Sequence, residues 1–122
     1  MSNLVNLIAR ALLSALFIAG GLDKINGYAR SLDYMAAYNV PGFLLPGVIA
    51  LELVGGLALL AGFMTRWVAL ALAVFCLLAA VIFHTGFGNP IQVAMFLKNL
   101  AIAGGLLLLY AHGGGGWTMS KG

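Results

Sequence analysis

Five side chains that can form hydrogen bonds or carry protons stand inside, or at the ends of, segments that are otherwise apolar. They are Lys24, Glu52, His84, Lys98 and Asn99. Ammonium, imidazole and amide groups can donate hydrogen bonds to a bound head group, and a carboxylate can relay a proton. These residue types therefore predict a site for a polar or proton-active ligand in apolar surroundings.

The composition identifies those surroundings as a membrane. Of the 122 residues, 63% are hydrophobic and only 7% are charged, and the mean hydropathy is +1.08. A soluble domain carries about a quarter charged residues, so this chain cannot cover a water-facing surface. Its six basic and three acidic residues form no basic run, and nucleic acid is therefore not an expected partner.

Four apolar segments have the length of membrane-spanning helices, which need about 20 residues for a core of about 30 Å. They lie at residues 4–22, 44–63, 66–84 and 93–111. Backbone groups in lipid must be satisfied within the segment, so each is expected to be helical. The predicted fold class is all-α, an integral membrane four-helix bundle in a single domain over residues 1–122.

The connections predict the remaining features. Between the first two spans, Tyr28, Leu32 and Met35 recur at helical spacing with polar residues between them, which predicts a short interfacial amphipathic helix. The glycine-rich tail, residues 113–122, is expected to be flexible. The 3.6-residue period places one stripe on the first helix and one on the fourth. These stripes are Arg10, Ser14, Phe17, Gly21 and Lys24, and Lys98, Ala101 and Gly105.

An up-and-down bundle brings the five polar residues to one half of the membrane. The expected depth is about 7 Å for Lys98 and roughly 9–13 Å for Glu52 at 1.5 Å per residue. A charge that faces lipid costs several kcal/mol, so these groups should point inward and pair. Lys98 and Lys24 are the two candidate partners of the Glu52 carboxylate.

Two interpretations of this cluster stay open. In the first, a buried salt bridge fixes how the helices pair, His84 is an ordinary interfacial residue and Asn99 caps a backbone group. In the second, the cluster forms a polar pocket that receives a ligand.

Several other chemistries are excluded by residue type and spacing. Cys76 is the single cysteine, so the paired thiols that a membrane thiol oxidase needs are missing. His84 and His112 end helices that run in opposite directions, which places them too far apart for a shared haem. No set of ligands for zinc is evident, and no metal site is predicted.

With these features the chain resembles the DoxX family of small four-helix membrane proteins over nearly its whole length. The likeness is carried by His84 and by ARALLSALFIAGGLDKINGY at 9–28, VPGFLLPGVIALELVGGLALLAGF at 40–63 and MFLKNLAIAGG at 95–105. The resemblance implies that the five polar residues occupy family-typical positions. It also implies the bacterial inner membrane, and an association with membrane oxidoreductases, including a thiosulfate:quinone oxidoreductase, and with assemblies for redox defence.

The first functional hypothesis is accordingly a quinone-interacting accessory subunit of a membrane redox system. No electron-carrying centre is evident, so a redox partner subunit would supply electrons. The alternatives are a structural or assembly subunit without catalysis, and a small lipid-binding or transport protein. No catalytic motif is present; an active form would be a quinone-linked oxidoreductase component.

Orientation and assembly are also predicted. An even number of spans places both termini on one side, together with Arg10, Arg66 and Lys121, and the distribution of basic residues favours the cytoplasm for that side. Alanine-rich faces permit a homo-oligomer in the lipid bilayer.

Overall fold

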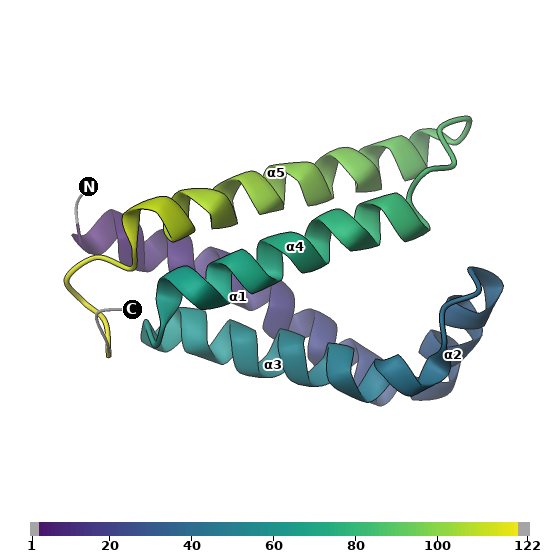
Figure 1. The fold of residues 1–122 in the computed structure, drawn as a ribbon, viewed down its shortest axis with the longest axis horizontal. Helices are drawn as coiled ribbons and strands as arrows, with labels where there is room; N and C mark the ends of the chain where they lie inside the picture. The colour runs from purple at the N-terminus through teal and green to yellow at the C-terminus, as the bar shows by residue number, and fades with distance from the viewer. Residues whose placement is uncertain (1–2, 120–122) are drawn as a thin grey trace.

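The computed structural model describes residues 3–119, which form an all-helical protein (Figure 1). The elements are α1 (Asn3–Asn26), α2 (Tyr28–Ala37), the 3-10 turn η1 (Gly42–Leu44), α3 (Leu45–Ala61), α4 (Thr65–Phe83) and α5 (Pro90–His112). Four of the helices, α1, α3 extended by η1, α4 and α5, are long and apolar enough to cross a membrane. The predicted all-α class, the four apolar helices and the short helix between the first two are confirmed.

The long helices associate as two antiparallel couples. α1 packs along α3, and α4 packs along α5, while α3 and α4 meet over a shorter stretch and α1 and α5 hardly touch in the described part of the chain. The couples lie together at the end that carries the N-terminus and the turn between α3 and α4. They diverge toward the opposite end, where α2 lies (Figure 1). We call these the terminal end and the α2 end.

Glycines set the close approach of α1 and α3. A Cβ at Gly56 would lie 2.8 Å from Ile18 Cγ1 and 3.3 Å from the backbone oxygen of Ser14. A Cβ at Gly21 would lie 2.6 Å from the side chain of Leu53. Missing side chains thus allow backbone-to-backbone packing, which is a main source of helix association in lipid.

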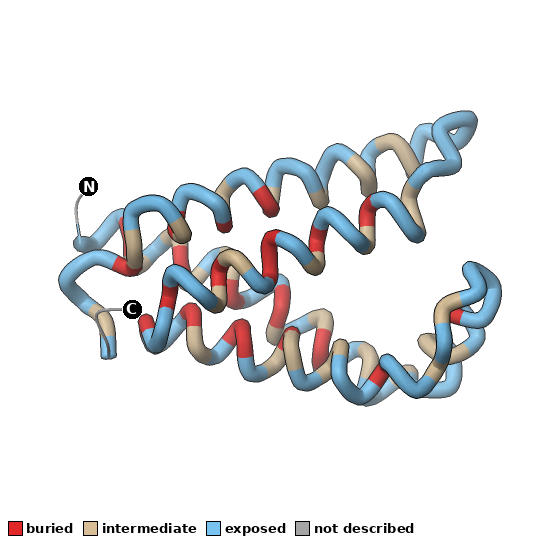
Figure 2. Tube along the Cα trace, in the orientation of Figure 1, coloured by how far each residue is buried: buried red, intermediate tan, exposed pale blue. Residues whose placement is uncertain are grey.

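Buried positions follow the inner faces of the helices (Figure 2). On α1, the predicted stripe is buried from Arg10 to Gly21, whereas Lys24 is partly exposed. On α5, the predicted stripe of Lys98, Ala101 and Gly105 is not the buried face. That face consists of Ala103, Leu106 and Leu109, which pack into the hydrophobic core.

The terminal end is built around Arg10, whose side chain is completely buried. Its Nη1 donates to the carbonyls of Leu59 and Leu60 at 3.0 and 3.1 Å, and its Nε donates to Asn6 Oδ1 at 3.0 Å. The last carbonyls of a helix have no intrahelical donor and carry partial negative charge. The guanidinium therefore satisfies the end of α3 without a carboxylate.

The tail makes hydrogen bonds to the terminal end. Arg10 Nη2 donates to the Trp117 carbonyl at 2.6 Å, and the Met119 amide donates to the Ala61 carbonyl at 3.1 Å. The Gly116 amide also donates to Asn3 Oδ1 at 2.8 Å. Residues 113–119 therefore contact α1 and α3, and their expected flexibility stays a prediction. Residues 120–122 lie outside the described part.

Substitution of Gly56 tests the glycine contact. We expect Gly56→Val to lower the free energy of unfolding by about 1–3 kcal/mol, since the added atoms overpack against the backbone of α1. Thermal unfolding in detergent measures the change. The matched control is Gly104→Val, because nothing lies within 4 Å of a Cβ at Gly104. Equal melting temperatures for the two variants would contradict this account.

Substitution of Arg10 tests the terminal end. We expect Arg10→Met to lower the free energy of unfolding by about 1–3 kcal/mol, because buried carbonyls lose their donor. Hydrogen–deuterium exchange should also become faster at the amides of Gly116 and Met119. Arg66→Met is the control, since Arg66 is exposed and donates to one carbonyl, that of Tyr110. Unchanged tail exchange in Arg10→Met would show that Arg10 does not hold the tail.

Candidate intramembrane binding site

Glu52 and Lys24 form an ion pair between α3 and α1. Lys24 Nζ lies 2.8 Å from Glu52 Oε1, and the side chains are 30% and 5% exposed. The second carboxylate oxygen lies against the backbone of Gly20, where a Cβ would come within 2.6 Å of Glu52 Oε2. Of the two candidate partners of Glu52, Lys24 is the one that binds it, and Gly20 provides the space for the carboxylate.

Lys98 does not pair with Glu52, contrary to one of the two predicted pairings. Its side chain is exposed on α5, and the ion pairs found among residues 3–119 join Lys24 to Glu52 and Arg30 to Asp23. The physical reason lies in the fold: α5 packs on α4, and this couple diverges from the couple that carries Glu52. Residues 65–112 contain no aspartate or glutamate, so α4 and α5 offer Lys98 no carboxylate.

Lys98 nevertheless lies at the level of Glu52 along the bundle. The register of α1 and α5 is given by the bond from Asn6 Nδ2 to the Gly113 carbonyl, and by Gly105, where a Cβ would lie 3.9 Å from Leu13 Cδ2. Seven residues after Leu13 on α1 comes Gly20, and seven residues before Gly105 on α5 comes Lys98. Because the two helices are antiparallel, Gly20 and Lys98 are at the same level along the bundle. Gly20 is the residue that touches the Glu52 carboxylate.

Cys76 on α4 belongs to the hydrophobic core and is buried, with 4% of its surface exposed. We refer to Gly20, Lys24, Glu52 and Lys98 as the polar level.

The two other predicted residues lie beside the polar level. Asn99 is partly buried and continues, one turn earlier, the inward stripe of Ala103 and Leu106 on α5. His84 ends α4, and its Nδ1 lies 2.9 Å from Gln92 Oε1 on α5. His84 therefore connects α4 to α5. In the part of the chain that the structure describes, no hydrogen bond or ion pair joins His84 to either Glu52 or Lys24.

Helix α2 contacts the end of α4 through a cluster of aromatic rings. Its Tyr34 and Tyr38 rings contact the Phe83 ring at the end of α4, with centroids 5.1 and 5.0 Å apart. Burial, and then the neighbouring Tyr38, raise the pKa of the Tyr34 phenol. This aromatic cluster connects α2 to the end of α4, at the end of the bundle where the two couples diverge.

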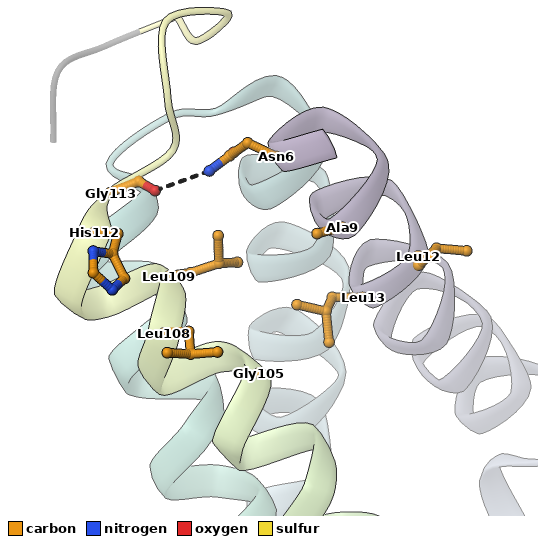
Figure 3. A pocket seen from close by; sticks show the side chains of 9 residues that line it. All are labelled: Asn6, Ala9, Leu12, Leu13, Gly105, Leu108, Leu109, His112 and Gly113. Carbon is orange, nitrogen blue, oxygen red and sulfur yellow. Dashed lines mark hydrogen bonds between the residues drawn. The ribbon is translucent and has the colours of Figure 1, made fainter. Parts of the chain in front are cut away.

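An apolar groove lies between α1 and α5 at the terminal end (Figure 3). Its volume is about 330 Å³ and nearly all of its lining is apolar. The lining residues are Asn6, Ala9, Leu12, Leu13, Gly105, Leu108, Leu109, His112 and Gly113. At the outer end, the hydrogen bond from Asn6 to the Gly113 carbonyl, 3.3 Å long, crosses from one helix to the other (Figure 3).

Sequence reasoning missed Gly20, Gln92 and the groove. The Gly20-Gly21 pair, one turn before Lys24, was the signal that α3 approaches α1 there. Gln92 and the groove depend on how α5 sits against α4 and α1, which no local pattern reveals. Within residues 3–119, no three His, Cys, Asp or Glu side chains come together in a way that could hold a metal ion.

Comparisons with known proteins find a family profile and two inner membrane relatives. A DoxX family profile matches residues 5–85, a range that includes Lys24, Glu52 and His84. The chain is 50% identical over 115 residues to inner membrane protein YqjF of Escherichia coli (strain K12), covering 94% of this chain and 88% of that protein. It is 33% identical over 122 residues to inner membrane protein YphA of the same organism, covering 94% and 87%. No solved structure matches the chain.

A double-mutant cycle tests the ion pair. We expect Lys24→Met to lower the free energy of unfolding by about 1–3 kcal/mol, because it leaves a buried carboxylate without its donor. The double variant Lys24→Met/Glu52→Met should recover part of that loss, since an apolar pair needs no partner charge. Thermal unfolding in detergent gives both values.

The exposed pair provides the control for this cycle. Arg30 and Asp23 lie 3.2 Å apart with both side chains 70% exposed, so Arg30→Met should cost little. Additive losses in the Lys24 and Glu52 variants would mean that the buried pair does not act as a unit.

Proposed function

Because this chain belongs to the DoxX family of inner-membrane proteins, we propose that its polar level binds the head group of a membrane-dissolved quinone and that it serves a membrane redox system as an accessory subunit. The protein is a small multi-pass protein of the inner membrane. Lys24, Glu52, Lys98 and Asn99 form the proposed head-group site, with His84 at its edge toward α2.

The observation that carries the proposal is an exposed cation inside a spanning helix. Lys98 is eight residues beyond Pro90, which places it about 12 Å along α5 from its start. A charge that faces hydrocarbon costs several kcal/mol, so such residues face a partner or a polar cavity. Since α4 and α5 contain no acid, a ligand oxygen is the partner that fits the free ammonium.

The chemistry of the polar level suits a quinone. A quinone carbonyl accepts hydrogen bonds, which the Lys98 ammonium and the Asn99 amide can donate. Proton transfer accompanies quinone reduction, and Glu52 is a carboxylate that can relay a proton. Electrons would come from a partner subunit, because the side chains of this chain supply acid–base groups and no redox centre.

Contacts at the two ends of the bundle support a ligand that arrives through the lipid. Arg10 and residues 113–119 cover the terminal end, and at the α2 end Tyr34 and Tyr38 of α2 contact the end of α4. The sparse contact between α1 and α5 leaves the side of the bundle as the route of entry. This arrangement also argues against transport, which needs access from both sides.

A structural or assembly role is the second candidate. It is favoured by the direct contact of Lys24 with Glu52, because a carboxylate that already has a cation needs no ligand. In that case, Lys98 would have no role in binding, and the two candidates differ in what its removal does.

We also propose that both termini lie in the cytoplasm. Arg10 and Arg66 both lie at the terminal end, and basic residues concentrate on the cytoplasmic side of membrane proteins.

Quinone titration of the protein in lipid nanodiscs tests the proposed function. We expect saturable binding to wild type and a Kd raised roughly 10- to 100-fold in Lys98→Met, because a charge-assisted hydrogen bond contributes about 1.5–3 kcal/mol. Arg66→Met removes a cation at the other end of the bundle and should bind as wild type does. No binding to wild type, or equal Kd values in wild type and Lys98→Met, would refute the proposal and leave the structural role.

A further inference from the structure

The groove and the polar level lie on one continuous face between α1 and α5. On α1, the groove residues Ala9 and Leu13 continue at helical spacing through Leu16 to Gly20. On α5, the face that carries the groove residues Leu109 and Gly105 also carries Lys98, which lies two turns before Gly105. A ligand head at the polar level therefore has the groove directly along the bundle, toward the terminal end.

The distances define what could fill this path. The inner end of the groove, at Leu13 and Gly105, is seven residues from Gly20 and Lys98, or about 10 Å at 1.5 Å per residue. The outer end, at Asn6, is fourteen residues from Gly20, or about 21 Å. There, the bond from Asn6 to Gly113 and the tail close the path.

From this geometry we infer that the α1–α5 groove seats the hydrocarbon tail of the ligand whose head binds at the polar level. The inference rests on the proposed function and adds the ligand class to it: an amphiphile with a single hydrocarbon tail of about 10–21 Å. A shorter tail does not reach the groove, and a longer one meets the closed outer end.

The depth of the head distinguishes this ligand from a phospholipid that enters from the α2 side. One leaflet of the hydrocarbon core is about 15 Å thick, and a phospholipid keeps its phosphate at the surface. Its acyl chain would therefore end near the level of Lys98, about 12 Å along α5, and would not fill the groove beyond it. A head that itself lies inside the core leaves its tail free to cross into the other leaflet.

The apolar lining suits this occupant. Side chains of Leu12, Leu13, Leu108 and Leu109 supply methyl groups, and Gly105 leaves open the space that a side chain would take. Each buried methylene adds favourable transfer free energy, so affinity should rise with tail length until the groove is full.

A tail-length series tests the inference. Quinones with one ring structure and no tail, a short tail or a long tail are titrated into nanodiscs, with Kd expressed per mole of lipid so that partitioning cancels. Wild type should bind the long-tailed quinone at least tenfold more tightly than the tailless ring. Gly105→Leu, which fills the groove, should abolish this gain and bind the tailless ring as wild type does.

Matched variants separate the groove from helix propensity and folding. Gly104→Leu makes the same substitution on the neighbouring residue, where nothing lies within 4 Å of a Cβ, and should keep the gain. Ala9→Leu fills the groove from α1, with Ala15→Leu on the exposed face of α1 as its control, should Gly105→Leu fail to fold.

The outcomes distinguish the inference from the function on which it rests. If the ring binds through Lys98 but Gly105→Leu and Ala9→Leu leave the tail-length gain unchanged, the groove assignment is overturned and the proposed function stands. If no quinone binds, the proposed function fails first. If the groove variants remove the gain while Lys98→Met binds normally, the groove seats a quinone tail but the head does not bind at Lys98, and both the proposed head-group site and its connection to the groove are overturned.

Discussion

A buried guanidinium without a carboxylate holds the terminal end of this bundle together. Arg10 joins three segments of the chain, because its donors satisfy the last carbonyls of α3, the side chain of Asn6 and the carbonyl of Trp117. In lipid no water is available to accept hydrogen bonds from the guanidinium in place of these oxygens. The buried position of Arg10 therefore depends on all of these acceptors being present at once. The closure of this end follows from these bonds and from the tight turn between α3 and α4.

The charges at the polar level are arranged unequally between the two couples. The α1–α3 couple contains a complete pair, with Glu52 bound to Lys24 and seated against Gly20. The α4–α5 couple contains Lys98 and no acid. A salt bridge that only fixed helix pairing would account for the first couple and leave the second unexplained. The uneven distribution is therefore the physical basis of the proposal that this level binds a ligand.

Much of the architecture follows from local patterns. Apolar runs of spanning length, the spacing of Tyr28, Leu32 and Met35, and the stripe from Arg10 to Gly21 predict the four long helices, α2 and the inner face of α1. The choice between Lys24 and Lys98 as the partner of Glu52 could not be predicted, because it depends on how far the couples diverge. The hydrogen bonds of the tail could not be predicted for a similar reason: Arg10 binds residues 49 and 107 positions away, which the local run of four glycines does not indicate.

The separation of a neutral pair from a lone cation has an electrical consequence. Moving one elementary charge across the whole membrane changes its energy by about 2.3 kcal/mol per 100 mV of transmembrane voltage. Glu52 with Lys24 carries no net charge and is nearly indifferent to that field. Lys98 stands part of the way across and experiences a fraction of it, so the side chain left free on α5 is also the one on which an energised membrane exerts a force.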